Sequence, residues 1–174
     1  LLRRGVSGVT NREVFIEGTA ALRSDFADDE RLAVIFEDGL RIYRNSGELI
    51  SETPFDGSPP TFCAISKGYV SMLFGSGQTL TDTELAVYDK NGRSVYRVTT
   101  GSIGNVRELA ADGQDVYIRT GEGILCVTDK GNRLAEATVH KDTLTLLITE
   151  NGELMACTPA FAHRIDPSDF TPVS

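Results

Sequence analysis

Four acidic residues lie close together near the start of the chain: Asp25, Asp28, Asp29 and Glu30. Such a cluster could bind a hard cation, because calcium takes about six to eight oxygen ligands and loop carboxylates can supply them. The spacing does not match the D-x-D-x-D-G order of a calcium loop, since no glycine stands at the required position. A solvated acidic turn explains the cluster better, and we predict no metal site.

The chain has only two histidines, so general acid–base chemistry has few candidates. His140 stands beside Lys141 and Asp142, and His163 stands beside Arg164. No Gly-x-Ser-x-Gly elbow, no H-E-x-x-H motif and no telling pairing of His with Ser or Cys accompanies them. We therefore predict ordinary histidines, no catalytic residues, and a protein that is not an enzyme.

Three cysteines, Cys63, Cys126 and Cys157, lie among apolar residues in strand-like segments. Their number is odd and no C-x-x-C spacing occurs, so we expect buried, unpaired thiols rather than a metal or redox site. The glycine-rich stretches Gly75–Gly77 and Gly121–Gly123 lead into neither a helix nor a lysine, which a phosphate cradle would need. We predict turns at both stretches and no cofactor.

Composition excludes several classes of partner. The 174 residues suffice for one domain with a sizeable core, and 40% hydrophobic with 24% charged residues is an ordinary globular balance. A net charge of −8 repels phosphate backbones, so we expect no nucleic acid partner. The sequence has neither a basic run nor a long apolar run, so we expect no membrane contact by this segment itself. Because the chain begins with Leu1 rather than Met, we interpret it as a fragment or a processed form.

The elements that must position these residues are strands, and their pattern repeats. A strand followed by a tight turn recurs with the turn at positions 47, 92, 131 and 169, at intervals of 45, 39 and 38 residues. A period near 40 that is built from short strands is typical of a β-propeller blade. No segment keeps helical spacing over three turns. The copies are Leu40–Gly47, Leu85–Gly92, Ile124–Gly131 and a worn copy, Ala162–Asp169.

We therefore predict an all-β fold: a β-propeller with four blades of four antiparallel strands, either a small closed propeller or part of a larger one. The blades cover about 19–55, 60–99, 103–139 and 143–173 of the single 1–174 domain. Turn signals separate the strands, and we expect positive φ at Gly92 and Gly131. The longest polar insertion, Gly75–Thr83, is predicted to be a plain loop, with a binding loop as the alternative. The turn signals are Asp38-Gly39, Asn91-Gly92, Asp112-Gly113 and Asn151-Gly152.

The sequence leaves open how the ends of the propeller are covered. The strand-like segment Glu13–Ile16 could close a four-blade ring against His163–Asp166. The predicted outer strand of the last blade, Phe170–Val173, is short and contains proline, so it makes a poor ladder strand. The favoured alternative leaves the flanks of the first and fourth blades bare, so that missing blades or a second copy must cover them.

The unit Leu85–Gly92 resembles the repeat of the pyrroloquinoline-quinone-like and WD40-like propeller superfamily. Through Arg31–Glu52 and Glu84–Val98, the chain also resembles the C-terminal part of an uncharacterised, membrane-anchored propeller family of Gram-positive bacteria. The resemblance implies a propeller fold and an extracytoplasmic, membrane-anchored setting for the full-length protein. The chain has no tryptophan and no adjacent cysteine pair, and these departures argue against a quinone cofactor.

The function that we expect is that of a non-catalytic interaction or scaffold module, whose binding residues the sequence does not identify. Propellers bind partners on a rigid face through connecting loops, and a protein or a glycan would suit such a face. The alternative is a segment of an enzyme whose catalytic residues lie outside this fragment, and a third is a structural extracellular spacer. An enzyme should repeat its polar residues at equivalent channel-facing positions, whereas only scattered single residues qualify here.

Overall fold

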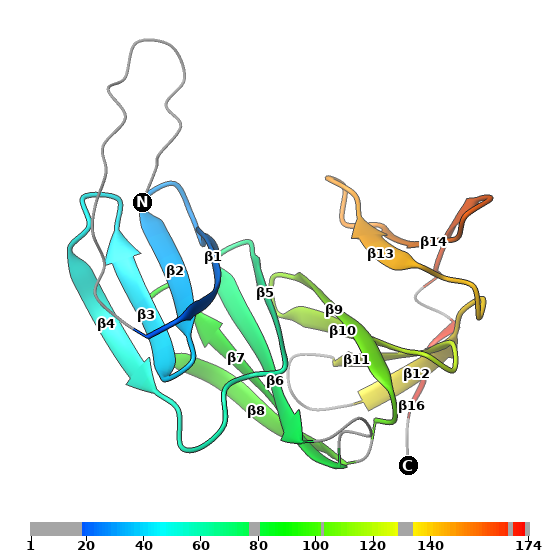
Figure 1. The fold of residues 1–174 in the computed structure, drawn as a ribbon. Coiled ribbons are helices and arrows are strands. Elements are labelled where there is room, and N and C mark those ends of the chain that lie inside the picture. The colour runs from blue at the N-terminus through cyan, green and yellow to red at the C-terminus, as the bar shows by residue number, and fades with distance from the viewer. Residues whose placement is uncertain (1–18, 77–80, 102, 129–133, 167–168, 173–174) are drawn as a thin grey trace.

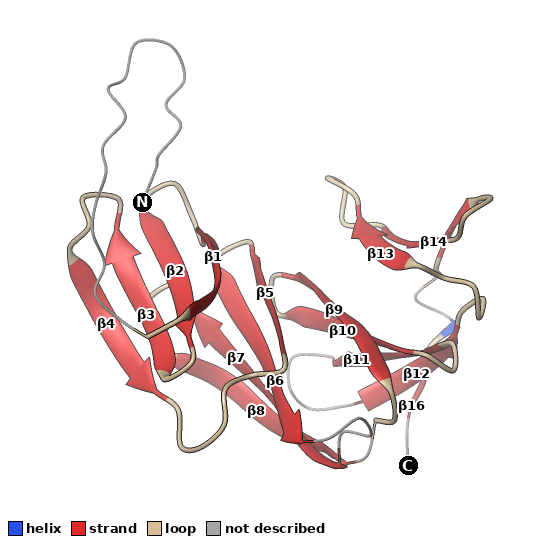
Figure 2. Ribbon diagram, in the orientation of Figure 1, coloured by secondary structure: helices blue, strands red, loops and turns tan. Residues whose placement is uncertain are grey.

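The computed structural model describes residues 19–76, 81–101, 103–128, 134–166 and 169–172. These residues form sixteen strands in four antiparallel sheets (Figure 2). They contain no α-helix, and their only helical residue is in a short 3₁₀ turn at Asp169. The sheets follow one another along the chain as the blades of an open arc (Figure 1). The prediction of an all-β propeller is confirmed. In the same residue ranges, no helix has the length and apolar character that crossing a membrane would require.

The first two blades each have four strands, which pair with their neighbours in chain order. Hairpins of this kind follow from period-2 alternation of apolar residues between short turns. The first blade consists of β1 (Ala21–Phe26), β2 (Arg31–Phe36), β3 (Gly39–Arg44) and β4 (Leu49–Pro54). The second consists of β5 (Phe62–Ser66), β6 (Tyr69–Ser76), β7 (Thr81–Asp89) and β8 (Ser94–Gly101).

The third and fourth blades depart from the expected four strands each. The third sheet has five strands and the fourth has three. The third consists of β9 (Val106–Asp112), β10 (Asp115–Thr120), β11 (Ile124–Thr128), β12 (Leu134–Thr138) and, beyond β12, β16 (Thr171–Pro172). The fourth consists of β13 (Thr145–Ile148), β14 (Leu154–Cys157) and β15 (Ala162–Arg164).

The predicted outer strand of the fourth blade is therefore wrong, because Thr171 and Pro172 pair with β12 of the third blade instead. Phe170 packs against the apolar core between the third and fourth blades, which directs the following residues back toward β12. Pro172 has no N–H to donate, so a two-residue pairing at an outer edge is the position that it tolerates best.

Three apolar cores hold neighbouring blades together, and the first strand of each blade lies beside the first strand of the next. No contact of that extent joins β1 to β13, so the arc stays open among the described residues. The candidate closing strand, Glu13–Ile16, lies outside those residues. The core between blades one and two includes Ala33, Ile35, Leu40, Ile42, Val70, Met72, Ala86 and Tyr88.

The turn predictions are confirmed in part. Gly92 has φ 77°, and Gly113 and Gly152 are likewise positive, whereas Gly131 lies outside the described residues. Gly39 is different, because it begins β3 without a positive φ. A Cβ at Gly39 would come within 2.8 Å of the Thr53 carbonyl oxygen, so this position requires close approach of two backbones.

The polar insertion is largely strand rather than loop. β6 extends to Ser76 and β7 begins at Thr81, and these two residues face each other in the ladder. Only residues 77–80 of the predicted loop remain, and they lie outside the described residues. The plain loop predicted over Gly75–Thr83 is therefore wrong over most of its length.

Candidate functional site

The Asp28 carboxylate lies in the turn between β1 and β2, and cationic partners surround it. Its Oδ1 accepts the backbone N–H groups of Glu30 at 2.9 Å and Arg31 at 2.8 Å. Its Oδ2 lies 3.0 Å from the Arg31 guanidinium and 3.0 Å from the Lys90 ammonium of the second blade. Asp28 therefore builds its own turn and links the first two blades.

The rest of the predicted acid cluster does not converge on one point. Asp25 lies in β1, while Asp29 and Glu30 are exposed in the turn. Across the described ranges, no three His, Cys, Asp or Glu side chains gather as metal ligands would. The predicted acidic turn therefore holds Asp28, Asp29 and Glu30, whereas Asp25 belongs to the strand before it and accepts the N–H of Phe26.

The electrostatics of Asp28 agree with this geometry. Partial burial alone would raise the pKa of Asp28, because it penalises the charged form. The hydrogen bonds from Lys90, from the Glu30 N–H and from Arg31 more than offset that effect and lower the pKa to about 2. The carboxylate is thus ionised at any physiological pH.

A hollow of about 450 Å³ lies beside Asp28, on the rim where the first two blades meet. Turns from both blades line it, and they bring charges of both signs to one surface. We call this surface the rim hollow. Its lining residues are Ala27, Asp28, Lys67, Gly68, Tyr69, Asp89, Lys90 and Asn91.

Local sequence explains the shape of the rim hollow. Lys67 and Gly68, with φ 47° and 84°, form a two-residue hairpin turn that requires positive φ twice. Sequence reasoning missed this turn, although its glycine and the flanking strands were signals. On the facing hairpin, Asp89 Oδ1 accepts the N–H groups of Asn91 at 2.8 Å and Arg93 at 2.9 Å, which fixes that turn.

The same rim is tied to the third blade. Lys67 forms an ion pair with Asp112, at the end of β9. Gln114 donates from Nε2 to the Tyr69 hydroxyl at 2.9 Å, and the Tyr96 hydroxyl donates to the Gln114 carbonyl at 2.7 Å. Contacts among the first three blades therefore hold the surface around the rim hollow in place.

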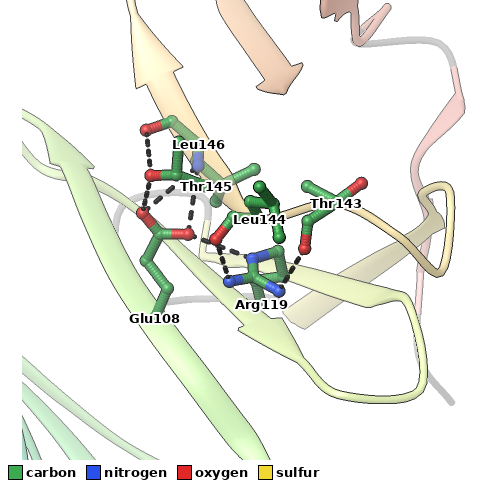
Figure 3. Close-up of polar contacts among 6 residues, drawn as sticks. All are labelled: Glu108, Arg119, Thr143, Leu144, Thr145 and Leu146. Atoms are coloured by element: carbon green, nitrogen blue, oxygen red, sulfur yellow. Dashed lines mark hydrogen bonds and ion pairs between the residues drawn. The ribbon is translucent and has the colours of Figure 1, made fainter. Parts of the chain in front are cut away.

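A second polar cluster joins the third and fourth blades (Figure 3). Arg119 of β10 is only 8% exposed, and its Nε lies 3.0 Å from Glu108 Oε2 on β9. Its two terminal nitrogens donate to the carbonyl oxygens of Thr143 at 2.9 Å and Leu144 at 2.7 Å. One guanidinium fork thus binds a carboxylate and the backbone that enters the fourth blade.

Glu108 makes a second set of contacts with the fourth blade (Figure 3). Its carboxylate accepts the Thr145 hydroxyl at 2.6 Å and the backbone N–H of Leu146 at 3.0 Å. The sequence placed Glu108 and Arg119 in strands but carried no sign of these partners, which lie 24 to 38 positions away. Because the charged groups of Glu108 and Arg119 are paired within the chain, we interpret this cluster as one that holds the fourth blade against the third.

The structure brings the rings of both histidines close to one phenylalanine, Phe161. The His140 and Phe161 rings lie 5.8 Å apart, and the Phe161 and His163 rings lie 6.0 Å apart. His140 Nδ1 accepts the N–H of Asp142 at 3.2 Å. Nothing in the sequence pattern indicated this grouping, because Phe161 approaches His140 from a separate hairpin.

Two of the three cysteines can be assessed. Cys63 and Cys157 are unpaired, as predicted, but they are half-buried rather than fully buried. Burial raises the pKa of Cys63, and nearby Arg23 lowers it by a smaller amount. The side chain of Cys126 lies outside the described residues. The prediction of buried, unpaired thiols is therefore confirmed in part: both described thiols are unpaired, and both are only half-buried.

The glycine-rich stretch Gly121–Gly123 forms the turn between β10 and β11, as predicted. A Cβ at Gly123 would lie 2.8 Å from the Val139 carbonyl oxygen, so this glycine permits a close backbone approach. The other stretch, Gly75–Gly77, begins at the end of β6 rather than forming a turn over its described part.

Four twisted sheets that pack in sequence through apolar cores define this protein as a β-propeller. The chain belongs to the family of unknown function DUF5711, whose model matches residues 9–165. No curated protein matches the sequence.

Solved structures share the fold at low sequence identity. The computationally designed Ika4 protein aligns with a TM-score of 0.62 and 13% identity over 88% of this chain and 94% of its own. BamB from Moraxella catarrhalis aligns with a TM-score of 0.54 and 12% identity over 80% of this chain and 40% of its own. A protein of unknown function from Bacteroides caccae aligns with a TM-score of 0.56 and 9% identity over 95% of this chain and 63% of its own. The present chain thus spans about two fifths of BamB and under two thirds of the Bacteroides protein.

Proposed function

We propose that this protein is a non-catalytic interaction module that binds a protein partner at the rim hollow. The observation that carries the proposal is the construction of this surface. Asp28, Lys67 and Lys90 come from two adjacent blades, and turns with fixed geometry hold them around one hollow. Loops on a rigid scaffold are the usual place for recognition.

The chemistry of the rim hollow favours recognition over catalysis. It presents two ammonium groups, two carboxylates, an amide and a phenol, without an activated nucleophile beside a base. The Lys67 and Lys90 side chains remain 56% and 46% exposed despite their ion pairs. They can therefore exchange their present carboxylates for those of a partner at little cost.

The setting of this module forms part of the same proposal. The resemblance of Arg31–Glu52 and Glu84–Val98 to a membrane-anchored propeller family supports an extracytoplasmic position in the full-length protein. A partner exposed on the same side of the membrane would then meet the rim.

A capture experiment with matched variants tests the proposed function. Immobilised wild-type chain is compared with a Lys67→Ala/Lys90→Ala variant and with a Lys141→Ala/Arg107→Ala control, which removes two exposed cations away from the rim hollow. We expect a protein from an extract of the producing cells to be retained by the wild type and the control and lost from the rim variant. Equal retention of every protein by all three chains would refute the proposal, provided that thermal melts show all three folded.

A further inference from the structure

The two lysines of the rim hollow come from adjacent hairpin turns of the second blade. Lys67 lies between β5 and β6, and Lys90 follows directly after β7. β6 and β7 pair so that Tyr69 faces Asp89, which places the next residues on each strand, Gly68 and Lys90, beside each other. A Cβ at Gly68 would lie 3.9 Å from Lys90 Cδ, so the stem of Lys90 runs along this glycine. One patch of the rim therefore carries two positive charges.

Each of these ammonium groups keeps hydrogen-bonding capacity that the chain does not use. An ammonium group has three N–H donors. Lys67 pairs with Asp112 of the third blade, and Lys90 lies 3.0 Å from Asp28 of the first. Within the described residues these are the ion pairs of the two lysines, whose side chains are 56% and 46% exposed. Donors of both groups therefore remain accessible to an acceptor outside the chain, even while the present partners stay in place.

The carboxylates that line the rim hollow are, in contrast, largely occupied by their own surroundings. Asp28 accepts two backbone N–H groups of its turn and pairs with both Arg31 and Lys90. Asp89 Oδ1 accepts two backbone N–H groups of its turn, and its Oδ2 lies 3.4 Å from Asn91 Nδ2. The unused capacity of the rim hollow is thus mainly that of cationic donors, which an anionic acceptor would complement.

We propose that the partner of the rim hollow presents an acidic segment, in which at least two Asp or Glu side chains pair with Lys67 and Lys90. This inference rests on the proposed interaction function and names the chemistry of the partner. The hollow of about 450 Å³ has room for such side chains. The overall charge of −8 does not prevent this contact, because charges more than about 8 Å apart are largely screened at physiological ionic strength.

A titration with short peptides of defined charge tests this inference. The probe is a peptide in which glutamates alternate with serines, acetylated and amidated so that its termini carry no charge. Matched peptides contain glutamine or lysine in place of glutamate, and inorganic phosphate serves as a free anion. Binding to the ¹⁵N-labelled chain is followed by the amide NMR signals of Lys67, Gly68, Lys90 and Asn91, which can report weak binding.

We expect the glutamate peptide to shift these signals and the glutamine and lysine peptides to leave them unchanged. Lys67→Gln and Lys90→Gln should each raise the Kd of the glutamate peptide by about two- to fivefold, as the loss of one exposed ion pair would. Raising NaCl from about 0.1 M to about 1 M should also weaken binding, because the screening length falls from about 10 Å to about 3 Å. The control Arg107→Gln/Lys141→Gln removes two exposed cations elsewhere and should keep the wild-type Kd. Thermal melts show that each variant is folded.

Several outcomes overturn the acidic segment. They are unchanged rim signals with the glutamate peptide, equal affinity for the glutamine peptide, and a wild-type Kd in both rim variants. Phosphate that binds as tightly as the glutamate peptide assigns the patch to free anions and overturns it as well. None of these outcomes removes the proposed function, because capture of a protein that depends on Lys67 and Lys90 would still support an interaction module with a partner of different chemistry.

Discussion

Arg119 and Glu108 lie 3.0 Å apart on adjacent strands of the third blade, and each then bonds to the backbone that enters the fourth. The pair is therefore both an ion pair and a joint between blades (Figure 3). The fourth blade has only three strands, so it has less interstrand pairing of its own than a four-stranded blade. Contacts to the third blade therefore contribute more to the stability of the fourth blade.

Replacing Arg119 by methionine should lower the free energy of unfolding by about 2–4 kcal/mol, because Glu108 and two carbonyl groups lose their partner in a mostly buried site. Arg119→Lys should lose less, since it keeps the charge but cannot fork to three acceptors. Urea denaturation measures both. Arg107→Met, at an exposed arginine on β9, should change stability by less than about 0.5 kcal/mol. Equal losses of unfolding free energy for Arg107→Met and Arg119→Met would contradict the role of Arg119 in joining the two blades.

Asp28 should make stability depend on pH in the acid range. Its pKa falls from 3.8 to about 2 on folding, so the carboxylate contributes stability above pH 4 that is lost as the pH falls toward 2. Since Asp28 is 27% exposed, we expect a contribution of about 1–2 kcal/mol. Asp28→Asn mimics the protonated form, so its difference from wild type should be present at pH 7 and vanish near pH 2.

The control for this prediction is Asp29→Asn, which neutralises the neighbouring exposed carboxylate. Its unfolding free energy should stay within about 0.5 kcal/mol of wild type at pH 7. A wild-type minus Asp28→Asn difference that is constant between pH 7 and pH 2 would rule out the ionised Asp28 as its source.

Gly92 should tolerate no larger side chain. Its φ of 77° is strained for other residues, and a Cβ would collide with Ser51 of the first blade. Gly92→Val should therefore destabilise by about 1–3 kcal/mol, or by more if Ser51 cannot shift. Gly57→Ala is the comparison, because Gly57 also has positive φ while its Cβ would meet nothing within 4 Å. Thermal melts should show the larger loss for Gly92→Val, and the reverse order would contradict the turn geometry.

The thiols should differ in reactivity. Cys63 lies between the first two blades with a raised pKa, so little of it is thiolate at neutral pH. Cys157 lies on the fourth blade, across the ladder from the exposed Ala162. Ellman titration of the native protein should show a fast phase that Cys157→Ser removes and Cys63→Ser leaves. Three equivalents should react after denaturation without reductant, and fewer would reveal a disulfide.

The strands of the third blade show which part of the fold can be predicted from local sequence. Val106–Ala110, Asp115–Arg119, Ile124–Thr128 and Arg133–Val139 can all be read from apolar alternation between turns, and each matches a strand of the structure over its described residues. Strand alternation and turn glycines depend on residues a few positions apart, which is why this part of the fold is predictable. The same holds for Gly92, whose turn signal is local, and for the turn role of the acidic cluster around Asp28.

Contacts between blades are a different matter, because they depend on how whole sheets are placed. Alternation shows that Arg119 lies in a strand, but only the packing of the fourth blade turns its guanidinium toward Thr143 and Leu144. The sequence likewise could not pair Lys90 with Asp28 or show that both histidine rings lie near Phe161. It also assigned the last strand to the fourth blade, whereas the packing of Phe170 carries Thr171 and Pro172 to the third. The repeat by itself determined the class of fold and its turns, and the tertiary structure decided which surfaces meet, since neighbouring blades are joined by residues far apart in the chain.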